Sequence, residues 1–442
     1  MREQLMALDE QKVPIRVAVI GCGRFGSMMI TQIRRAPGME VAVACDMDGE
    51  RALASMSQAG YSIEDLTLTD RCSEANDAIR NSRSVVTSDS NIAIVSDVDV
   101  IVEATGNPEL GTLHAVRAIE AQRHIVMVNV EADVLTGPTL KRMADDNGVV
   151  YSLAYGDQPA IIEEMYDWAA SLGFDVIAAG KWTRYMARYR KGTPEEALSI
   201  YGHLPGEITE KRLNPQMYNS FLDGTKSAIE MCAVANMTGL VPDIPGMHFP
   251  PCGLKDLPRV LSPIENGGIL TQSGVVEVVS CIDESGKDIP DALRWGVFVV
   301  LTSDSAYLKS CLKDYGVAMD PSGTYAAMYL PYHLVGMEAP VSIARAYLRG
   351  EPTGAPMGRV GEVAAVAKRP LNTGDVLDGE GGHTVYGQLI TSSHARSRNV
   401  LPIGLCHNVK IVKSVEEDQV LSLDDVEIVA TNLSKQLRQE HP

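Results

Sequence analysis

Three glycines near the start of the chain are spaced as in a phosphate-binding loop. The segment VAVIGCGRFGSMMI places Gly21, Gly23 and Gly26 in a G-x-G-x-x-G pattern, after an apolar run typical of a buried strand and at the start of an amphipathic run typical of a helix. The first glycine makes a tight turn, the second admits a diphosphate close to the backbone, and the third lets the helix pack on the strand. Free N–H groups at the helix start attract phosphate. The pattern predicts a bound dinucleotide, with Arg24 and Phe25 beside it.

An acidic residue and two arginines bear on which dinucleotide binds. Asp46 ends the second apolar run, near the position from which a carboxylate contacts the ribose hydroxyls of NAD. Arg24 and Arg51 could instead bind the 2′-phosphate of NADP. These residues alone leave the choice between the two cofactors open.

Two further loops follow predicted strands of the same sheet. Thr105 and Gly106 form one, and residues 129–133, which include Asn129, form the other. Ligands of open α/β sheets bind beyond the carboxyl ends of the strands, so we expect both loops to line the nicotinamide half of the cleft. Plain turn chemistry is the alternative for the first loop. In the second, the carboxylates of Glu131 and Asp133 could bind Mg²⁺ or Mn²⁺.

Five cations and no acid occur between residues 181 and 191, in the segment KWTRYMARYRK. Arginine suits bidentate contact with phosphate or carboxylate, and lysine adds a point charge. The segment therefore predicts an anion pocket for a phosphorylated or carboxylated substrate, although a solvated basic face is the alternative. The side chains expected to bind substrate are Lys181, Arg184, Arg188 and Lys191, together with Asp157 and Gln158 at the expected domain junction.

A third group of charges lies in YNSFLDGTKSAIEMCAVAN, which is expected to form one helix. Asp223, Lys226 and Glu230 then approach one face at positions i, i+3 and i+7. A lysine could polarise a substrate carbonyl while the carboxylates relay a proton. The alternative is an ordinary surface ion pair between Lys226 and Glu230.

Composition limits the classes of protein that the chain can represent. Its 442 residues are 45% apolar and 22% charged, which is typical of a globular protein with two or three domains. The net charge of −18 disfavours nucleic acid and anionic membranes as partners. Eight scattered cysteines without a CxxC pair indicate no disulfide framework or zinc site, as in a reducing cytosol. The polar N-terminus and the lack of a long apolar run predict a cytoplasmic protein.

Alternating strand and helix signals set the predicted fold. Residues 1–157 are expected to form an α/β domain with a doubly wound parallel Rossmann sheet, with a polar, mostly helical segment between residues 46 and 83. Residues 158–352 are expected to form an α+β catalytic domain that also provides the oligomer interface. Residues 353–442 are expected to form a small all-β domain of short strands. Predicted strands include residues 15–20, 41–45, 99–104, 124–130, 149–154, 275–282, 295–302, 363–369, 383–390 and 426–429.

Two parts of the chain resemble known families. Residues 15–160, with GCGRFG, DVDVIVEATG and IVMVNVEAD, resemble the nucleotide-binding half of homoserine dehydrogenase, with Val130 where that enzyme commonly has a lysine. Residues 360–430, with AVAKRPLNTGDVLD, LPIGL and LSLDDV, resemble a SAF domain, a small β-clip module.

The combination resembles the DXR-like proteins, or type II 1-deoxy-D-xylulose 5-phosphate reductoisomerases. This resemblance implies conversion of that sugar phosphate to 2-C-methyl-D-erythritol 4-phosphate for isoprenoid synthesis through the methylerythritol phosphate pathway. It implies NADPH, a divalent cation and a homodimer, with Lys226 and Glu230 at the acid/base site and Lys181 and Arg184 on the substrate. One alternative is an NAD(P) dehydrogenase acting on a small carboxylate such as an amino-acid semialdehyde. Another is a dinucleotide-binding sensor without turnover.

Overall fold

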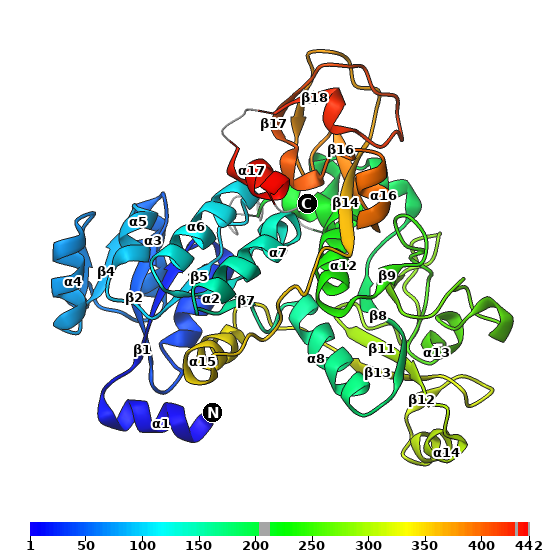
Figure 1. Ribbon diagram of the computed structural model, residues 1–442, viewed down its shortest axis with the longest axis horizontal. Coiled ribbons are helices and arrows are strands. Elements are labelled where there is room, and N and C mark those ends of the chain that lie inside the picture. Colours follow the sequence, from blue (N-terminus) through cyan, green and yellow to red (C-terminus); the bar gives the residue numbers. More distant parts are fainter. Residues whose placement is uncertain (203–212, 429–431, 441–442) are drawn as a thin grey trace. The chain divides into compact units, whose positions relative to one another are not determined.

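The computed structural model describes residues 1–202, 213–428 and 432–440. The chain forms two compact units (Figure 1). Unit 1 comprises residues 1–160, 334–356 and 433–442, and unit 2 comprises residues 161–333 and 357–432. The C-terminal strands therefore count with the middle of the chain in unit 2. The finer division into three domains, with boundaries at 157/158 and 352/353, stays a prediction.

A seven-stranded sheet forms the centre of unit 1, and each pair of neighbouring strands in it is parallel. The order β3-β4-β2-β1-β5-β6-β7 places β1 where the winding of the chain reverses. This order confirms the predicted doubly wound α/β fold. The strands are β1 (Ile15–Ile20), β2 (Met39–Cys45), β3 (Leu66–Leu68), β4 (Ser84–Thr87), β5 (Val100–Glu103), β6 (His124–Met127) and β7 (Tyr151–Leu153).

Helices of unit 1 bury an apolar stripe against this sheet. Met29, Ile30 and Ile33 on one side of α2 pack with Val17 and Val19 of β1 in a single core. The helices are α1 (Arg2–Gln11), α2 (Arg24–Ile33), α3 (Gly49–Gln58), α4 (Cys72–Arg80), α5 (Ser90–Val95), α6 (Pro108–Glu120), α7 (Val130–Asp146), α15 (Ala339–Arg349) and α17 (Leu433–Glu440), with a 3-10 turn η1 (Ile63–Asp65); α8 (Gln158–Ser171) begins in unit 1 and continues in unit 2.

One local prediction for unit 1, the mostly helical segment, was incomplete, and another was wrong. The segment between β2 and β4 holds an edge strand, β3, which sequence reasoning missed because a three-residue strand carries almost no periodicity. The expected loop at residues 129–133 is instead the start of α7, since the side chain of Asn129 accepts a hydrogen bond from the Ala132 N–H and caps the helix.

Unit 2 contains a six-stranded mixed sheet of order β12-β13-β11-β8-β10-β9. β8 pairs in parallel with β10 and antiparallel with β11. The strands are β8 (Asp175–Thr183), β9 (Val241–Pro242), β10 (Val275–Ser280), β11 (Val297–Thr302), β12 (Ala318–Met319) and β13 (Ala326–Leu330). The helices of this part are α9 (Pro194–Ile200), α11 (Pro215–Leu222), α12 (Thr225–Thr238), α13 (Leu257–Val260) and α14 (Ala306–Asp314), with 3-10 turns η2 (Ala187–Lys191) and η3 (Ile264–Asn266).

Short antiparallel strands follow in the C-terminal part of unit 2. β14 (Gly361–Ala367) pairs with β16 (Val385–Thr391), and a second sheet has the order β15-β17-β18. The predicted strand at 426–429 lies partly outside the described residues. The remaining elements are β15 (Val376–Asp378), β17 (His407–Ile411), β18 (Val426–Glu427), α16 (Ser392–Ser397), η4 (Ile403–Leu405) and η5 (Leu423–Asp425).

Helix α12 is the central helix of unit 2. It packs against β10 of the mixed sheet and against β14 and β16 of the C-terminal part (Figure 1). Of its residues, all except Lys226 are buried, and most of them are apolar or small. The buried charged residue of α12, Glu230, is therefore held in a low-dielectric environment.

Two findings bear on the classes of protein that the composition favours or excludes. In the ranges that the structure describes, no helix is both long and apolar enough to span a membrane. All eight cysteines are free thiols, and six of them are buried. Burial raises the pKa of the Cys45 thiol to about 12, so this thiol is a poor nucleophile at neutral pH.

Candidate functional site

The glycine loop of unit 1 has the shape that a diphosphate requires. Gly21 has φ of +96°, and a Cβ atom there would lie 2.7 Å from backbone atoms of Ala104. A Cβ at Gly26 would lie 1.9 Å from the carbonyl oxygen of Gly21, whereas a Cβ at Gly23 would meet no heavy atom within 4 Å. The first and third glycines thus serve the packing of the fold, and the second leaves open space beside the loop. Phe25, which follows, is partly buried against the unit 1 core.

Asp46 ties the tip of β2 to this loop. Its carboxylate accepts hydrogen bonds from the N–H of Cys22 (2.9 Å) and of Asp48 (3.0 Å). Arg51 lies 3.6 Å from Asp46 and 3.5 Å from Asp48, and 46% of its side chain is exposed. Arg24 is exposed at the first position of α2. Both an acid and two cations therefore stand near the expected place of the adenosine ribose.

Thr105 and Gly106 follow β5, as predicted. The Thr105 hydroxyl donates a hydrogen bond to the buried carboxylate of Glu103. Gly106 is exposed and has φ of +71°, a conformation that favours glycine. The threonine side chain thus holds the loop, while the glycine leaves its outer surface open.

Asn129 is buried and holds two loops together. Its side-chain oxygen accepts from Ala132, and its amide nitrogen donates to the carbonyl oxygen of Asn107, 2.9 Å away. The side chain predicted to bind cofactor is therefore engaged in positioning the loop that starts after Gly106.

The predicted metal ligands Glu131 and Asp133 face different environments. Asp133 is completely buried and accepts a hydrogen bond of 2.9 Å from the hydroxyl of Tyr151, whereas Glu131 is half-buried. Burial raises the pKa of Asp133 to about 7, although the Tyr151 hydrogen bond partly opposes this. Across the described residues, no three His, Cys, Asp or Glu side chains are grouped so as to hold a metal. This pair does not fit a divalent cation, because a carboxyl directed at a tyrosine in the core is not available as a ligand.

Asp157 and Gln158 are both buried at the start of α8. The Asp157 carboxylate accepts a hydrogen bond of 2.8 Å from the backbone N–H of Gln158. The preceding Gly156 has φ of +93°, and a Cβ there would lie 2.8 Å from the carbonyl oxygen of Leu334. Their part in binding substrate stays a prediction.

A buried ion pair of unit 2 joins β8 to α12. Lys181 and Glu230 form an ion pair, and 5% and 4% of the two residues are exposed. Burial alone would raise the pKa of Glu230, but the charges of Lys181 and Lys226 lower it below its usual value, with a smaller effect from His333. Glu230 is therefore ionised beside two ammonium groups. The predicted surface pair between Lys226 and Glu230 was wrong in that Glu230 is buried and has Lys181 as its ion-pair partner.

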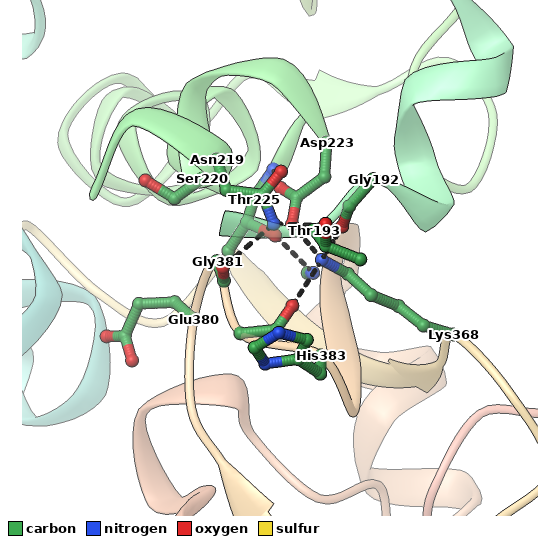
Figure 2. Close-up of polar contacts among 12 residues, drawn as sticks. Gly192, Thr193, Asn219, Ser220, Asp223, Thr225, Lys368, Glu380, Gly381 and His383 are labelled. Carbon is green, nitrogen blue, oxygen red and sulfur yellow. Dashed lines mark hydrogen bonds and ion pairs between the residues drawn. The ribbon is translucent and has the colours of Figure 1, made fainter. Parts of the chain in front are cut away.

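The predicted single helix from Tyr218 to Asn236 was also wrong. It breaks at Gly224, which adopts φ of +88°, so Asp223 ends α11 and does not share a helical face with Glu230. Asp223 pairs instead with Lys368, 2.8 Å away (Figure 2). The Lys368 amino group also donates to the carbonyl oxygens of Gly192 (3.1 Å) and Gly382 (2.7 Å).

Lys368 is a residue that sequence reasoning missed. It is 5% exposed and directly follows β14, in which every residue is buried. A lysine directly after the apolar run at residues 363–367 is a signal that could have drawn attention to it, since a buried lysine requires a partner. Burial raises the pKa of Asp223, and the charge of Lys368 opposes this.

The five cations of the 181–191 segment do not share one anion pocket. Each contacts a different partner: Lys181 pairs with Glu230, Arg184 with Asp288, Lys191 with Glu417 and Asp418, Arg190 donates to the hydroxyl of Tyr185, and Arg188 lies over the ring of Tyr189. A role for Arg184, Arg188 and Lys191 in substrate binding stays a prediction.

A second buried group was not foreseen. Glu277 on β10 is completely buried and accepts a hydrogen bond of 2.7 Å from Nδ1 of His248, and Asp243 lies 3.5 Å from Nε2 of the same ring. The hydrogen bond to Glu277 raises the pKa of His248, against an opposing effect of burial. These residues are too far apart in sequence for spacing to reveal them.

Sequence comparison divides the chain into two matched regions. Residues 15–155 match the family described as "Oxidoreductase family, NAD-binding Rossmann fold", and residues 156–339 match "Oxidoreductase DRL, catalytic domain". No curated protein matches the chain.

Several solved structures are similar to part of the chain. A probable dehydrogenase from Thermotoga maritima has 10% identity and a TM-score of 0.37, with 76% of this chain and 90% of that chain covered. An oxidoreductase from Agrobacterium radiobacter in complex with NAD+, L-tartaric acid and magnesium has 13% identity and a TM-score of 0.28, with 38% and 44% covered. The WlbA dehydrogenase from Bordetella pertussis in complex with NADH and UDP-GlcNAcA has 19% identity and a TM-score of 0.28, with 41% and 51% covered. The chain spans about half the length of the latter two.

The Rossmann fold, its glycine loop and the two matched regions define the class of protein: an NAD(P)-dependent oxidoreductase. In the chain, the region that matches the NAD-binding Rossmann family is followed directly by the region that matches the DRL catalytic domain.

Proposed function

We propose that the chain is an NAD(P)-dependent dehydrogenase that interconverts a carbonyl and a hydroxyl group on a small polar substrate, such as a semialdehyde that carries a carboxylate. The observation that carries the proposal is the ionised Glu230, buried on α12 with Lys181 and Lys226 in reach of its charge. Reduction of a carbonyl needs a cation that stabilises the developing oxyanion and a proton to complete the hydroxyl group.

The residues of unit 1 would hold the cofactor. Gly21, Gly23 and Gly26 shape the diphosphate loop, and Asp46 with Arg51 stands at the ribose position. When bound, the nicotinamide supplies hydride to the substrate carbon or accepts hydride from it.

Lys226 is the residue to which we assign the proton transfer. It is the one residue of α12 that is not buried, and in the proposed mechanism its ammonium group contacts a substrate oxygen. In reduction it donates a hydrogen bond to that oxygen and then the proton; in oxidation it takes the proton back. The lowered pKa of Glu230 makes this carboxylate a weak base at neutral pH. Its role is to hold the lysine charges in place, and Lys181 keeps it ionised.

We propose NADPH as the preferred cofactor. The carboxylate of Asp46 is already occupied by two backbone N–H groups and by Arg51, with 10% of its side chain exposed. Arg51 is far more exposed and carries the charge that a 2′-phosphate would contact.

A second candidate is the reductoisomerase reaction, which converts 1-deoxy-D-xylulose 5-phosphate to 2-C-methyl-D-erythritol 4-phosphate. It rests on the resemblance noted in the sequence, and the match of residues 156–339 to an oxidoreductase catalytic domain is compatible with it. Lys226 would polarise the ketone of this substrate. We derive no step through Mg²⁺ or Mn²⁺, because Glu131 and Asp133 do not fit such a cation.

The test is a substrate panel with the purified full-length protein. Oxidation of NADPH and NADH is followed with amino-acid semialdehydes and with 1-deoxy-D-xylulose 5-phosphate, with and without Mg²⁺ or Mn²⁺, and the products are identified by mass spectrometry. Turnover of a semialdehyde supports the dehydrogenase, and turnover of the sugar phosphate supports the second candidate. Binding of NADPH without turnover of any panel member contradicts both and supports a sensor.

Two further properties are proposed from resemblance alone. Residues 360–430 would form a SAF-like module, and the protein would be a cytoplasmic homodimer, the commonest symmetric assembly. Light scattering coupled to size-exclusion chromatography tests the dimer, since a monomer at micromolar concentration contradicts it.

A further inference from the structure

A small recess, partly open to solvent, lies within unit 2. Its walls come from four segments: the stretch after β8, the start of α12, the loop after β9, and β16. The lining residues that matter here are Tyr185, Arg190, Asp223, Phe249, Tyr386 and Gln388. Segments far apart in the sequence therefore meet around one small space, as in a binding site for a small molecule.

Arg190 is held in this wall by an aromatic support. Its Nε donates a hydrogen bond of 2.6 Å to the hydroxyl of Tyr185, whose ring packs on Phe249 with 4.1 Å between centroids. This leaves the two terminal amino groups of the guanidinium without an acceptor in the described part of the chain. Lys181, Arg184 and Lys191 each pair with a carboxylate, whereas Arg190 has none among the described residues. In a chain of net charge −18, an arginine without a carboxylate partner among the described residues is a candidate to bind an anionic ligand.

Two further polar side chains line the recess. Tyr386 is buried and Gln388 is half-buried, and in the described ranges neither the Tyr386 hydroxyl nor the Gln388 side-chain amide makes a hydrogen bond within the protein. Neither group is among the enclosed polar atoms that lack a partner, so both are open to the solvent, or to a ligand, in the recess. Both groups can donate to an oxygen atom.

The one carboxylate in the wall does not cancel the arginine charge. Asp223 is paired with Lys368 and accepts the Thr225 N–H (Figure 2). Asp418, which acts electrostatically on Tyr386, is paired with Lys191. These acids have their own cations, so Arg190 gives the recess a net positive charge.

We propose that this recess binds the oxyanion group, a phosphate or a carboxylate, of a small molecule. Arg190 supplies the charge and two donors, and Tyr386 and Gln388 supply the others. The proposal does not depend on the proposed dehydrogenase activity, because binding can be measured without turnover.

The test is calorimetric titration of the full-length protein with inorganic phosphate and, separately, with acetate, at an ionic strength kept constant with chloride. We expect saturable binding of at least one of them, and the tighter ligand identifies which oxyanion the recess prefers. Arg190→Ala should weaken this binding about tenfold or more, since a charge-assisted hydrogen-bond pair is lost. The matched control is Arg396→Ala, which removes an exposed arginine of α16 outside the recess and should leave binding unchanged.

A second variant covers the case in which Arg190→Ala disturbs the fold. Tyr386→Phe keeps the ring and removes the hydroxyl, and it should weaken binding severalfold while the melting temperature stays close to that of the wild type. Wild-type binding no tighter than that of chloride, or equal binding by Arg190→Ala, Tyr386→Phe and Arg396→Ala, overturns the proposal.

Discussion

Unit 2 contains two buried lysine–carboxylate pairs that differ in the number of hydrogen-bond acceptors around the lysine ammonium group. Lys368 gives its donors to Asp223 and to two backbone carbonyl oxygens, so its ammonium group is saturated. Lys181 has only Glu230 as a partner in the described ranges. A saturated pair in the core fixes structure, whereas an unsaturated one keeps the capacity to interact with something else.

The two carboxylates also differ in the number of cations around them. A second lysine, Lys226, and the ring of His333 act on Glu230, and the pKa of Glu230 falls despite burial. Asp223 has one lysine, and its pKa rises because burial dominates. The number of cations around these two buried carboxylates thus goes with the direction in which the pKa of each one shifts. For this reason we assign chemistry to the Glu230 region and support of the fold to the Asp223 region.

The largest expected effect is on catalysis at the first region. Lys226→Ala should lower kcat about 10²- to 10⁴-fold, the usual contribution of a positioned proton donor. Because Lys226 is not buried, the melting temperature should change little. Steady-state kinetics with the substrate found in the panel measures the loss, and Lys255→Ala, an exposed lysine, is the matched control. A kcat equal to that of the control would remove Lys226 from the mechanism.

The next effect is on stability at the second region. Lys368→Met leaves Asp223 buried without its cation, which should cost about 3–5 kcal/mol of unfolding free energy. Urea denaturation followed by circular dichroism measures it. Adding Asp223→Asn to this variant should recover part of the loss, because the unpaired charge is removed. If the single variant loses less than about 1 kcal/mol, a value typical of surface pairs, the structural role is wrong.

A carboxylate with no lysine extends the comparison to unit 1. The pKa of Asp133 is raised to about 7, above its unfolded value of about 3.9, so the folded state holds the proton more tightly. The contribution of Asp133 to the free energy of unfolding is complete below about pH 4. It is lost as pH rises toward 7, by at most about 1.4 kcal/mol per pH unit. Asp133→Asn should remove this part of the pH dependence. Identical stability curves of the two proteins between pH 4 and 7 would contradict it.

The smallest effect concerns an exposed cation in unit 1. Arg51→Ala should raise the Kd for NADPH about tenfold, as expected for loss of a charge-assisted contact to the 2′-phosphate. The Kd for NADH should change by less than about twofold. Nicotinamide fluorescence measures both constants. Equal weakening of the two cofactors would mean that Arg51 acts on the shape of the loop and not on the phosphate.

Local patterns made unit 1 predictable, whereas long-range pairings decide the site in unit 2. The glycine loop and β1 follow from adjacent residues, and the structure has β1 at the predicted residues 15–20. The strand β3 and the early start of α7 were missed because three residues and one capping asparagine leave little periodic signal. Lys226 and Glu230 could be singled out from their spacing.

The partners of these residues could not be predicted in the same way. The pairings of Lys181 with Glu230 and of Lys368 with Asp223 join positions that are 49 and 145 residues apart (230 − 181 and 368 − 223). The break at Gly224 was visible in the sequence as an Asp-Gly pair, a common turn signal, but the apolar pattern on both sides outweighed it.

The most direct test of the account uses Gly23. A Cβ at this position meets no atom of the protein within 4 Å, and its backbone is extended, so Gly23→Val should leave the free protein folded with an unchanged melting temperature. If the loop holds the diphosphate of the cofactor, the added side chain occupies its place, and the affinity for NADPH should fall about a hundredfold or more, since close approach of the backbone is lost. Unchanged NADPH affinity in a folded Gly23→Val protein would contradict the central claim that this loop binds the cofactor.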